Sequence, residues 1–243
     1  LIKKEVLNEK PDIITFQEAQ TNTVYKDIFP YFNSKGYWGY YIPQISPKYS
    51  FVSDEYNFGV VILFKISKFY SLKIGTIDFH KIAKRYLKKN KLKNLEDKIM
   101  KRFASLVMYL KDKSTGKKFY VITVHLEASP YFDDIKNLQG YIVMRYIDKI
   151  SKGKVPIILL GDFNSQPTSS NYHGITTGKS LNKFDMENID YSKPFINSPS
   201  IFSKFPLKSC YKEVFGKEPK HTNFTGKFKD TLDYIFVNSQ INV

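Results

Sequence analysis

Five polar residues in this sequence stand at points where apolar, strand-like segments end. They are Glu18, His125, Asp162, Asn164 and Asp233. In α/β proteins such ends are where a rigid scaffold meets solvent, and binding sites concentrate there. These positions are therefore the candidates for chemistry, although each also has a purely structural explanation.

Asp162 and Asn164 belong to the segment GDFN at 161–164, which follows the apolar run 155–160. Strand alternation predicts that both side chains share one face, with Phe163 turned into the core. An ionised Asp that takes a proton from water, beside an Asn directed at a phosphoryl oxygen, suits phosphodiester hydrolysis. The structural alternative is an Asx turn, because Gly, Asp and Asn all favour turns.

Glu18 follows the apolar run 13–16, and a carboxylate at a buried strand end must be paired, hydrogen-bonded or metal-bound. Mg²⁺ prefers one or two carboxylates together with waters and phosphate oxygens. His125 closes the run VITVH and would either donate to a substrate phosphate or make a structural hydrogen bond. Asp233 alternates out of an apolar strand, where it would orient a histidine or stand as a charge beside the strand.

The composition is that of a basic folded protein. The 243 residues suit one large α/β domain or two small ones. The net charge of +15 favours nucleic acid, an acidic membrane face or phosphorylated small molecules as partners, unless it only reflects a solvated surface. One cysteine, Cys210, excludes an intrachain disulfide and fits cytosol or nucleus. No stretch approaches the ~20 apolar residues of a membrane span.

Strand and helix patterns alternate along the chain without a linker between domains, so we expect a single domain over 1–243. Apolar runs and periodicities predict an amphipathic helix end at 1–10, strands at 12–16, 59–64, 69–74, 155–160 and 232–237, a hairpin of 105–110 with 118–125, and a helix over 134–150. The basic segment 80–102 is expected as a surface helix or loop, and the polar segment 182–206 as a surface insertion.

Taken in order, four motifs resemble those of the endonuclease/exonuclease/phosphatase superfamily. They are Gln17-Glu18 after Pro11-Asp12-Ile13, the segment TVHL at 123–126, GDFNS at 161–165 and LDYI at 232–235. This resemblance covers about residues 1–238. It implies a DNase-like α/β fold, a four-layer sandwich of two packed mixed β-sheets flanked by helices.

Two longer segments are similar to one branch, the carbon-catabolite-repressor-type deadenylases with nocturnin, angel and 2′-phosphodiesterase proteins. They are GDFNSQPTSSNY at 161–172 and HTNFTGKFKDTLDYIF at 221–236, and His125 is also followed by Pro130 and DIKNLQ at 134–139 as in that branch. The branch implies a Mg²⁺-dependent 3′→5′ exoribonuclease of the poly(A)-specific type that releases 5′-nucleoside monophosphates. RNA and deadenylase-complex proteins would be its partners, in the cytoplasm, the nucleus or both.

Carried over by position, the resemblance implies one role for each residue: Mg²⁺ or Mn²⁺ binding for Glu18, activation of water for Asp162, phosphate binding for Asn164 and His125, and orientation of a catalytic histidine for Asp233. Phe224 or Tyr172 would support a nucleotide pocket. Tyr40, Tyr41 and Tyr49 are expected either to stack on bases or to lie in the core.

The family pattern has an Asn in a strand upstream of the Gln-Glu motif and a Ser-Asp-His motif downstream, which this sequence lacks. We therefore expect the domain to be incomplete at both ends.

Two alternative functions remain open. One is a phosphodiesterase or phosphatase for a small molecule, such as 2′-5′ oligoadenylate, a dinucleotide 2′-phosphate, or an inositol or sphingolipid headgroup. The other is a catalytically inactive RNA- or protein-binding module.

Overall fold

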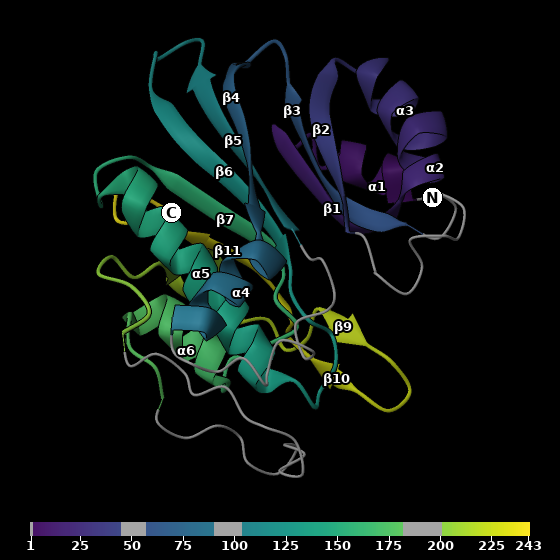
Figure 1. Ribbon diagram of the computed structural model, residues 1–243. Helices are drawn as coiled ribbons and strands as arrows, with labels where there is room; N and C mark the ends of the chain where they lie inside the picture. The colour runs from purple at the N-terminus through teal and green to yellow at the C-terminus, as the bar shows by residue number, and fades with distance from the viewer. Residues whose placement is uncertain (1, 45–56, 90–103, 182–200) are drawn as a thin grey trace.

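Two β-sheets pack face to face, with helices on both outer surfaces (Figure 1). The structure is a computed structural model, and it describes residues 2–44, 57–89, 104–181 and 201–243. The layers are helix, sheet, sheet and helix. The predicted four-layer α/β sandwich is therefore confirmed.

The smaller sheet has three described strands in the order β1-β3-β2, all antiparallel. They are β1 (Ile13–Gln20), β2 (Tyr37–Gln44) and β3 (Phe58–Lys65). Its outer face is covered by α1 (Ile2–Asn8), α2 (Thr21–Thr23), a π-helical turn (Val24–Ile28) and α3 (Phe29–Asn33).

The larger sheet has six strands in the order β4-β5-β6-β7-β11-β8. They are β4 (Phe69–Asp78), β5 (Ala104–Asp112), β6 (Lys118–His125), β7 (Ile157–Asp162), β8 (Lys208–Ser209) and β11 (Asp233–Val237). Strands β6 and β7 are parallel because α5 (Asp133–Ser151) crosses over between them, and the other pairs are antiparallel. Among the described strands only this sheet is mixed, so the prediction of two mixed sheets holds for the larger one alone.

Strand β3 is buried on both faces, which explains its continuous apolar run. Val61 and Leu63 pack toward the helices of the first layer. Val60 and Ile62 pack between the sheets, in a cluster that includes Leu106 of β5. Because side chains alternate along a strand, one that is covered on both sides has no position for a polar residue.

Helix α5 spans the outer face of the larger sheet together with α4 (Phe79–Lys89) and α6 (Ser170–Thr177) (Figure 1). The predicted helix over 134–150 is confirmed with one more residue at each end. It buries Ile142, Val143 and Ile147 in the core. A left-handed residue, Lys152 with φ of 48°, ends it. The remaining elements are α7 (Cys210–Phe215), β9 (Asn223–Phe224) and β10 (Lys229–Asp230).

Several boundaries differ from the predicted ones. The strand expected at 155–160 lies at Ile157–Asp162, so the GD of the motif belongs to it. Residues 80–89 of the basic segment belong to α4, which buries Ala83 and Leu87, so this part packs on the core and is not only a surface element. The rest of that segment to 102, and residues 182–200 of the expected insertion, lie outside the described residues.

Strand β2 and the helices between 21 and 33 were not predicted. Within β2, Tyr40 packs between the sheets and Tyr41 packs toward the first helical layer, so both belong to the core rather than to a base-stacking surface. Tyr49 lies outside the described residues. In the part of the chain that the structure describes, no helix combines the length and the apolar character needed to cross a membrane.

Candidate active site

Three neighbouring strands of the larger sheet bring three candidate residues into one row. In the parallel pair β6–β7, His125 lies opposite Asp162, and in the antiparallel pair β7–β11, Asp162 lies opposite Asp233. Neighbouring strands are about 4.8 Å apart, so this register fixes the three side chains side by side. The sheet therefore brings together three residues that are spread over more than 100 positions of the sequence.

Glu18 reaches this row from the smaller sheet. The pairing of β1 with β3 is shifted between Phe16 and Ala19, and Glu18 there has a φ of 52°. Such a bulge redirects a side chain. The Glu18 side chain is 70% exposed, and its Oε1 lies 3.7 Å from Nε2 of His125. The expectation of a buried strand end is wrong here, because the strand continues to residue 20 and the bulge turns the carboxylate outward.

His125 is 6% exposed and is held from the first sheet by Gln44, the last residue of β2. Its Nδ1 lies 3.2 Å from Oε1 of Gln44, and Nε2 of Gln44 donates to the His125 carbonyl at 3.3 Å. These contacts orient the ring so that Nε2 is the nitrogen directed at Glu18. Gln44 was missed because the strand that carries it was not predicted.

Asp162 lies between negative charges in a largely desolvated position. Burial, and to a smaller extent the neighbouring charges of Asp233 and Glu18, raise the pKa of its carboxyl to about 7. The N–H of Asn164 and the ammonium of Lys136 act in the opposite direction. A carboxyl with a pKa near neutrality can take up and release a proton at physiological pH, as a general base must.

Asn164 lies just beyond the end of β7 in the left-handed region, with a φ of 48°. Its backbone N–H donates to Oδ1 of Asp162 at 2.8 Å, and its Nδ2 donates to the carbonyl of Leu126 at 3.0 Å. Phe163 is buried, as predicted. Asn164 therefore makes the turn contact of the structural alternative and also lies beside Asp162, as the functional interpretation requires. A turn, rather than continued strand alternation, places it there.

Asp233 is held by Thr222, which was not singled out from the sequence. The Thr222 hydroxyl donates to Oδ2 of Asp233 at 2.6 Å and accepts the backbone N–H groups of Leu232 and Asp233, both at 3.0 Å. In the described part of the chain, the group that fixes this carboxylate is therefore a threonine. Its role in orienting a histidine remains a prediction.

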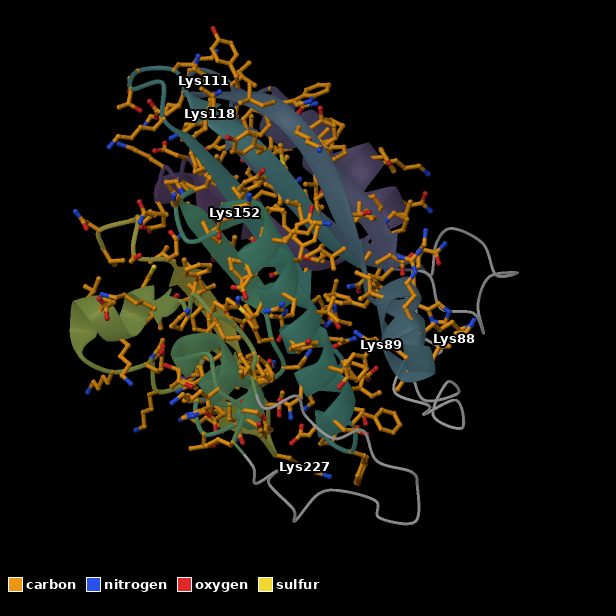
Figure 2. All side chains as sticks on the ribbon, turned by 60° about the vertical axis from the view of Figure 1, so that its left-hand side comes forward. Lys88, Lys89, Lys111, Lys118, Lys152 and Lys227 are labelled. Atoms are coloured by element: carbon orange, nitrogen blue, oxygen red, sulfur yellow. The ribbon has the colours of Figure 1, made fainter. Side chains whose placement is uncertain are left out.

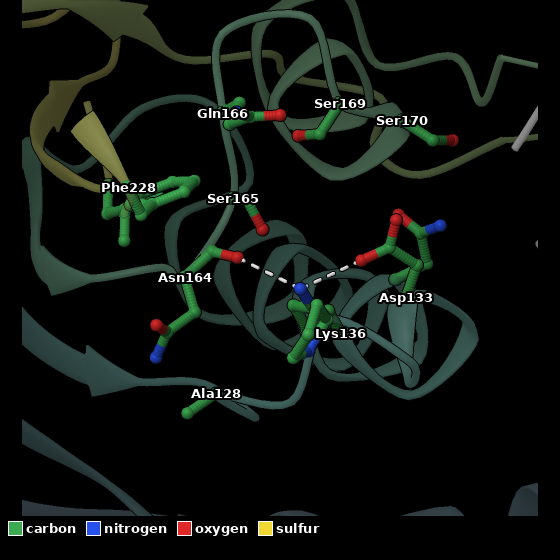
Figure 3. A pocket seen from close by; sticks show the side chains of 12 residues that line it. Ala128, Asp133, Lys136, Asn164, Ser165, Gln166, Ser169, Ser170 and Phe228 are labelled. Atoms are coloured by element: carbon green, nitrogen blue, oxygen red, sulfur yellow. Dashed lines mark hydrogen bonds and ion pairs between the residues drawn. The ribbon is translucent and has the colours of Figure 1, made fainter. Parts of the chain in front are cut away.

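A cavity of about 420 Å³ opens beside Asn164 (Figure 3). Its lining combines apolar and polar side chains from the β6–α5 loop, α5, the segment after β7 and the β9–β10 hairpin: Ala128, Pro130, Asp133, Lys136, Asn137, Asn164, Ser165, Gln166, Ser169, Ser170, Phe228 and Leu232. This volume lies within the range of small-molecule sites, which is roughly 300–1,000 Å³.

The two aromatic residues suggested for a nucleotide pocket lie elsewhere. Tyr172 is 7% exposed in the core, where its hydroxyl donates to Glu218 at 2.6 Å. Phe224 is 68% exposed and is not part of the cavity lining. The aromatic ring in the lining is that of Phe228, four residues further along the same hairpin motif.

The acidic residues fit a divalent cation bound largely through waters and substrate. No cluster of three or more His, Cys, Asp or Glu side chains suited to a metal occurs within the described ranges. However, Glu18 is exposed, and the charges of Glu18 and Asp233 both raise the pKa of Asp162. A cation would relieve that repulsion, and Mg²⁺ requires only one or two carboxylates.

The family model described as "Endonuclease/Exonuclease/phosphatase family" matches residues 1–243. The chain belongs to this family. The predicted superfamily is thereby confirmed. Nucleases of the Endonuclease/Exonuclease/phosphatase family generally use a divalent metal.

Relatives and solved structures agree with the predicted branch. The chain is 32% identical over 252 residues to the CCR4-Not complex 3′-5′-exoribonuclease subunit Ccr4 of Candida albicans, an alignment that covers 98% of this chain and 32% of that protein. It is similar in fold to ANGEL2, a 2′,3′-cyclic phosphatase (TM-score 0.78, 23% identity, 98% and 72% coverage). It is also similar to the human Nocturnin catalytic domain (TM-score 0.69, 21% identity, 98% and 73% coverage). The chain spans about a third of the length of the curated relatives it matches.

Proposed function

We propose that this chain is the phosphodiesterase core of a Mg²⁺-dependent 3′→5′ exoribonuclease of the deadenylase type. It would act on poly(A) or other RNA 3′ ends and release 5′-nucleoside monophosphates. The observation that carries the proposal is the row of His125, Asp162 and Asp233 at adjacent strand positions, with a nucleoside-sized cavity directly beside it. Similarity to Ccr4 exoribonucleases supports the choice of RNA.

Each residue of the site has a task in this reaction. Asp162, whose pKa is raised to about 7, takes the proton of the attacking water. The amide of Asn164 and the imidazole of His125 stabilise charge on the phosphoryl oxygens. Glu18 would hold the divalent ion, which when bound offsets charge on the phosphate and the leaving oxygen. Thr222 keeps the carboxylate of Asp233 in place.

The cavity suits the terminal nucleoside. Phe228 and Pro130 supply apolar surface for a base, and Asn164 in the same lining would contact the scissile phosphate. An aromatic ring can stack on any base, because every base has a π-face. Amide and hydroxyl groups in the same lining offer hydrogen bonds to the sugar and the base edge.

The positive charge of the protein supports an anionic polymer as substrate. Figure 2 shows lysines on separate elements, with Lys89 at the end of α4, Lys118 at the start of β6, Lys152 after α5 and Lys227 in the β9–β10 hairpin. Lysines on several elements attract phosphate groups through their charge, independently of the base sequence. Binding is therefore expected to weaken steeply as the salt concentration rises.

A substrate panel tests the proposal. With Mg²⁺ present, we expect faster turnover of an A-tailed RNA than of 2′-5′ oligoadenylate or NADPH, and loss of turnover with EDTA. Equal or faster turnover of a small molecule would replace the deadenylase assignment by that of a small-molecule phosphodiesterase or phosphatase. RNA binding without any turnover would identify an inactive binding module.

By similarity to Ccr4, we also expect protein partners of the deadenylase-complex type and a site of action in cytoplasm or nucleus.

A further inference from the structure

Lys136 is a buried cation at the floor of the cavity. Among the described residues it is the one lysine or arginine that is buried, with 6% of its surface exposed. A buried charge destabilises the fold unless it is paired and hydrogen-bonded. Solubility and surface charge therefore do not explain why a lysine occupies this buried position.

The ammonium of Lys136 has two partners, both drawn in Figure 3. One is Oδ1 of Asp133 at 2.8 Å, a turn earlier on the same helix. The other is the backbone carbonyl of Asn164 at 3.1 Å, which comes from the end of β7. An ion pair of the first kind forms equally well on the outside of a helix. The carbonyl of Asn164 is therefore the partner that accounts for the inward direction of the side chain.

Asn164 gains from such a contact because its left-handed backbone conformation is uncommon. Residues with a side chain adopt the left-handed region rarely; Asn tolerates it better than most, but its contacts must still hold it there. Its N–H is fixed by Asp162 and its side chain by the carbonyl of Leu126. Lys136 fixes the third point, the carbonyl oxygen. Together the three contacts determine the direction of the amide beside Asp162.

We propose that Lys136 is a positioning residue: it holds Asn164 in the left-handed conformation that directs its amide at the scissile phosphate. The ammonium acts through Asn164 and through its charge near Asp162, and it does not itself bind the substrate. Asp133 has a supporting role, since it compensates the charge of Lys136 inside the cavity. The catalytic part of this inference rests on the proposed phosphodiesterase function, whereas the conformational part does not.

The substitution Lys136→Met keeps the length and volume of the side chain but removes the charge and the donors. We expect kcat on an A-tailed RNA to fall about 10- to 100-fold with KM changed less than about twofold, because a displaced amide stabilises the transition state poorly. Lys136→Arg, which can still donate to the carbonyl, should recover part of kcat. Lys149→Met, an exposed lysine of the same helix, is the matched control and should behave as the wild type.

Amide hydrogen exchange gives a readout that is independent of activity. In the wild-type protein the Asn164 N–H is protected by Asp162, and in Lys136→Met we expect its exchange to be at least about tenfold faster while the β6 and β7 amides are unchanged. If exchange and kcat both stay at wild-type values, the ion pair is merely structural and the inference is overturned. A raised KM with unchanged kcat would overturn it in favour of direct substrate binding. An inactive wild type would refute the proposed function, and exchange would still decide whether Lys136 positions Asn164.

Discussion

Removing the charge of Asp162 should stabilise the fold in the absence of divalent metal. Asp162 is largely desolvated, and its pKa is raised from 3.8 to about 7 by burial and then by the charges of Asp233 and Glu18. The conservative change Asp162→Asn keeps the shape of the side chain and its acceptor for the Asn164 N–H. It removes only the ionisation that the folded state resists.

The sign and size follow from linkage. A carboxyl whose folded-state pKa is raised binds a proton more tightly in the folded than in the unfolded state, so its ionisation destabilises the fold. Well below pH 3.8 both states of the wild type are protonated and there is no penalty; the penalty grows as the pH rises and is complete well above the folded pKa of about 7. Three pKa units correspond to about 4 kcal/mol, and solvent access reduces this to about 2–4 kcal/mol. Against a total stability of roughly 5–15 kcal/mol this is a large effect.

Urea unfolding of the wild type and of Asp162→Asn between pH 4 and pH 8, in EDTA, measures the destabilisation caused by the ionised Asp162 carboxylate. The free energy of unfolding of the variant should exceed that of the wild type by an amount that grows by about 2–4 kcal/mol between pH 4 and pH 8. Other titrating groups are common to both proteins and largely cancel in the difference. A difference that is independent of pH would refute the reasoning, because Asp162 would then ionise as an ordinary exposed carboxyl.

Three further substitutions test the other parts of the site. Glu18→Gln should raise the Mg²⁺ concentration for half-maximal activity about tenfold or more, and an unchanged Mg²⁺ titration would argue against ligation. Thr222→Val removes the group that holds Asp233, so kcat should fall about tenfold and recover in Thr222→Ser; equal rates for the two variants would contradict this. Phe228→Ala should raise KM for A-tailed RNA about tenfold, since stacking on one base contributes roughly 1–3 kcal/mol. Phe224→Ala, at an exposed ring outside the cavity, is its control, and equal effects of the two changes would exclude a base contact at Phe228.

The strands that are covered on both faces could be predicted from the sequence, because such strands consist of continuous apolar runs. The runs ending near Phe64 and Leu160 show this pattern, and the polar motifs that follow the strands revealed the family. Strand β2 escaped because its residues 37–44 include a glycine and a proline and are only partly buried. Gln44, and its contact with His125, could not be foreseen without that strand.

The finer features of the site depend on register and turns, which motif spacing does not encode. The bulge that exposes Glu18 is a property of how β1 pairs with β3. The raised pKa of Asp162 depends on Asp233 lying directly opposite it in β11. Lys136 and Thr222 both lie within the segments that resemble the deadenylase branch, 134–139 and 221–236. Their roles emerge only from the hydrogen bonds that they make to Asn164 and Asp233.

Product analysis on a 5′-labelled, A-tailed RNA with Mg²⁺ tests the central claim most directly. The proposed function predicts a ladder of progressively shorter 5′-labelled species with 5′-AMP as the released product, and no ladder with Asp162→Ala although that variant remains folded. Release of labelled mononucleotide from the 5′ end, internal cleavage, or a wild-type ladder from Asp162→Ala would contradict the account.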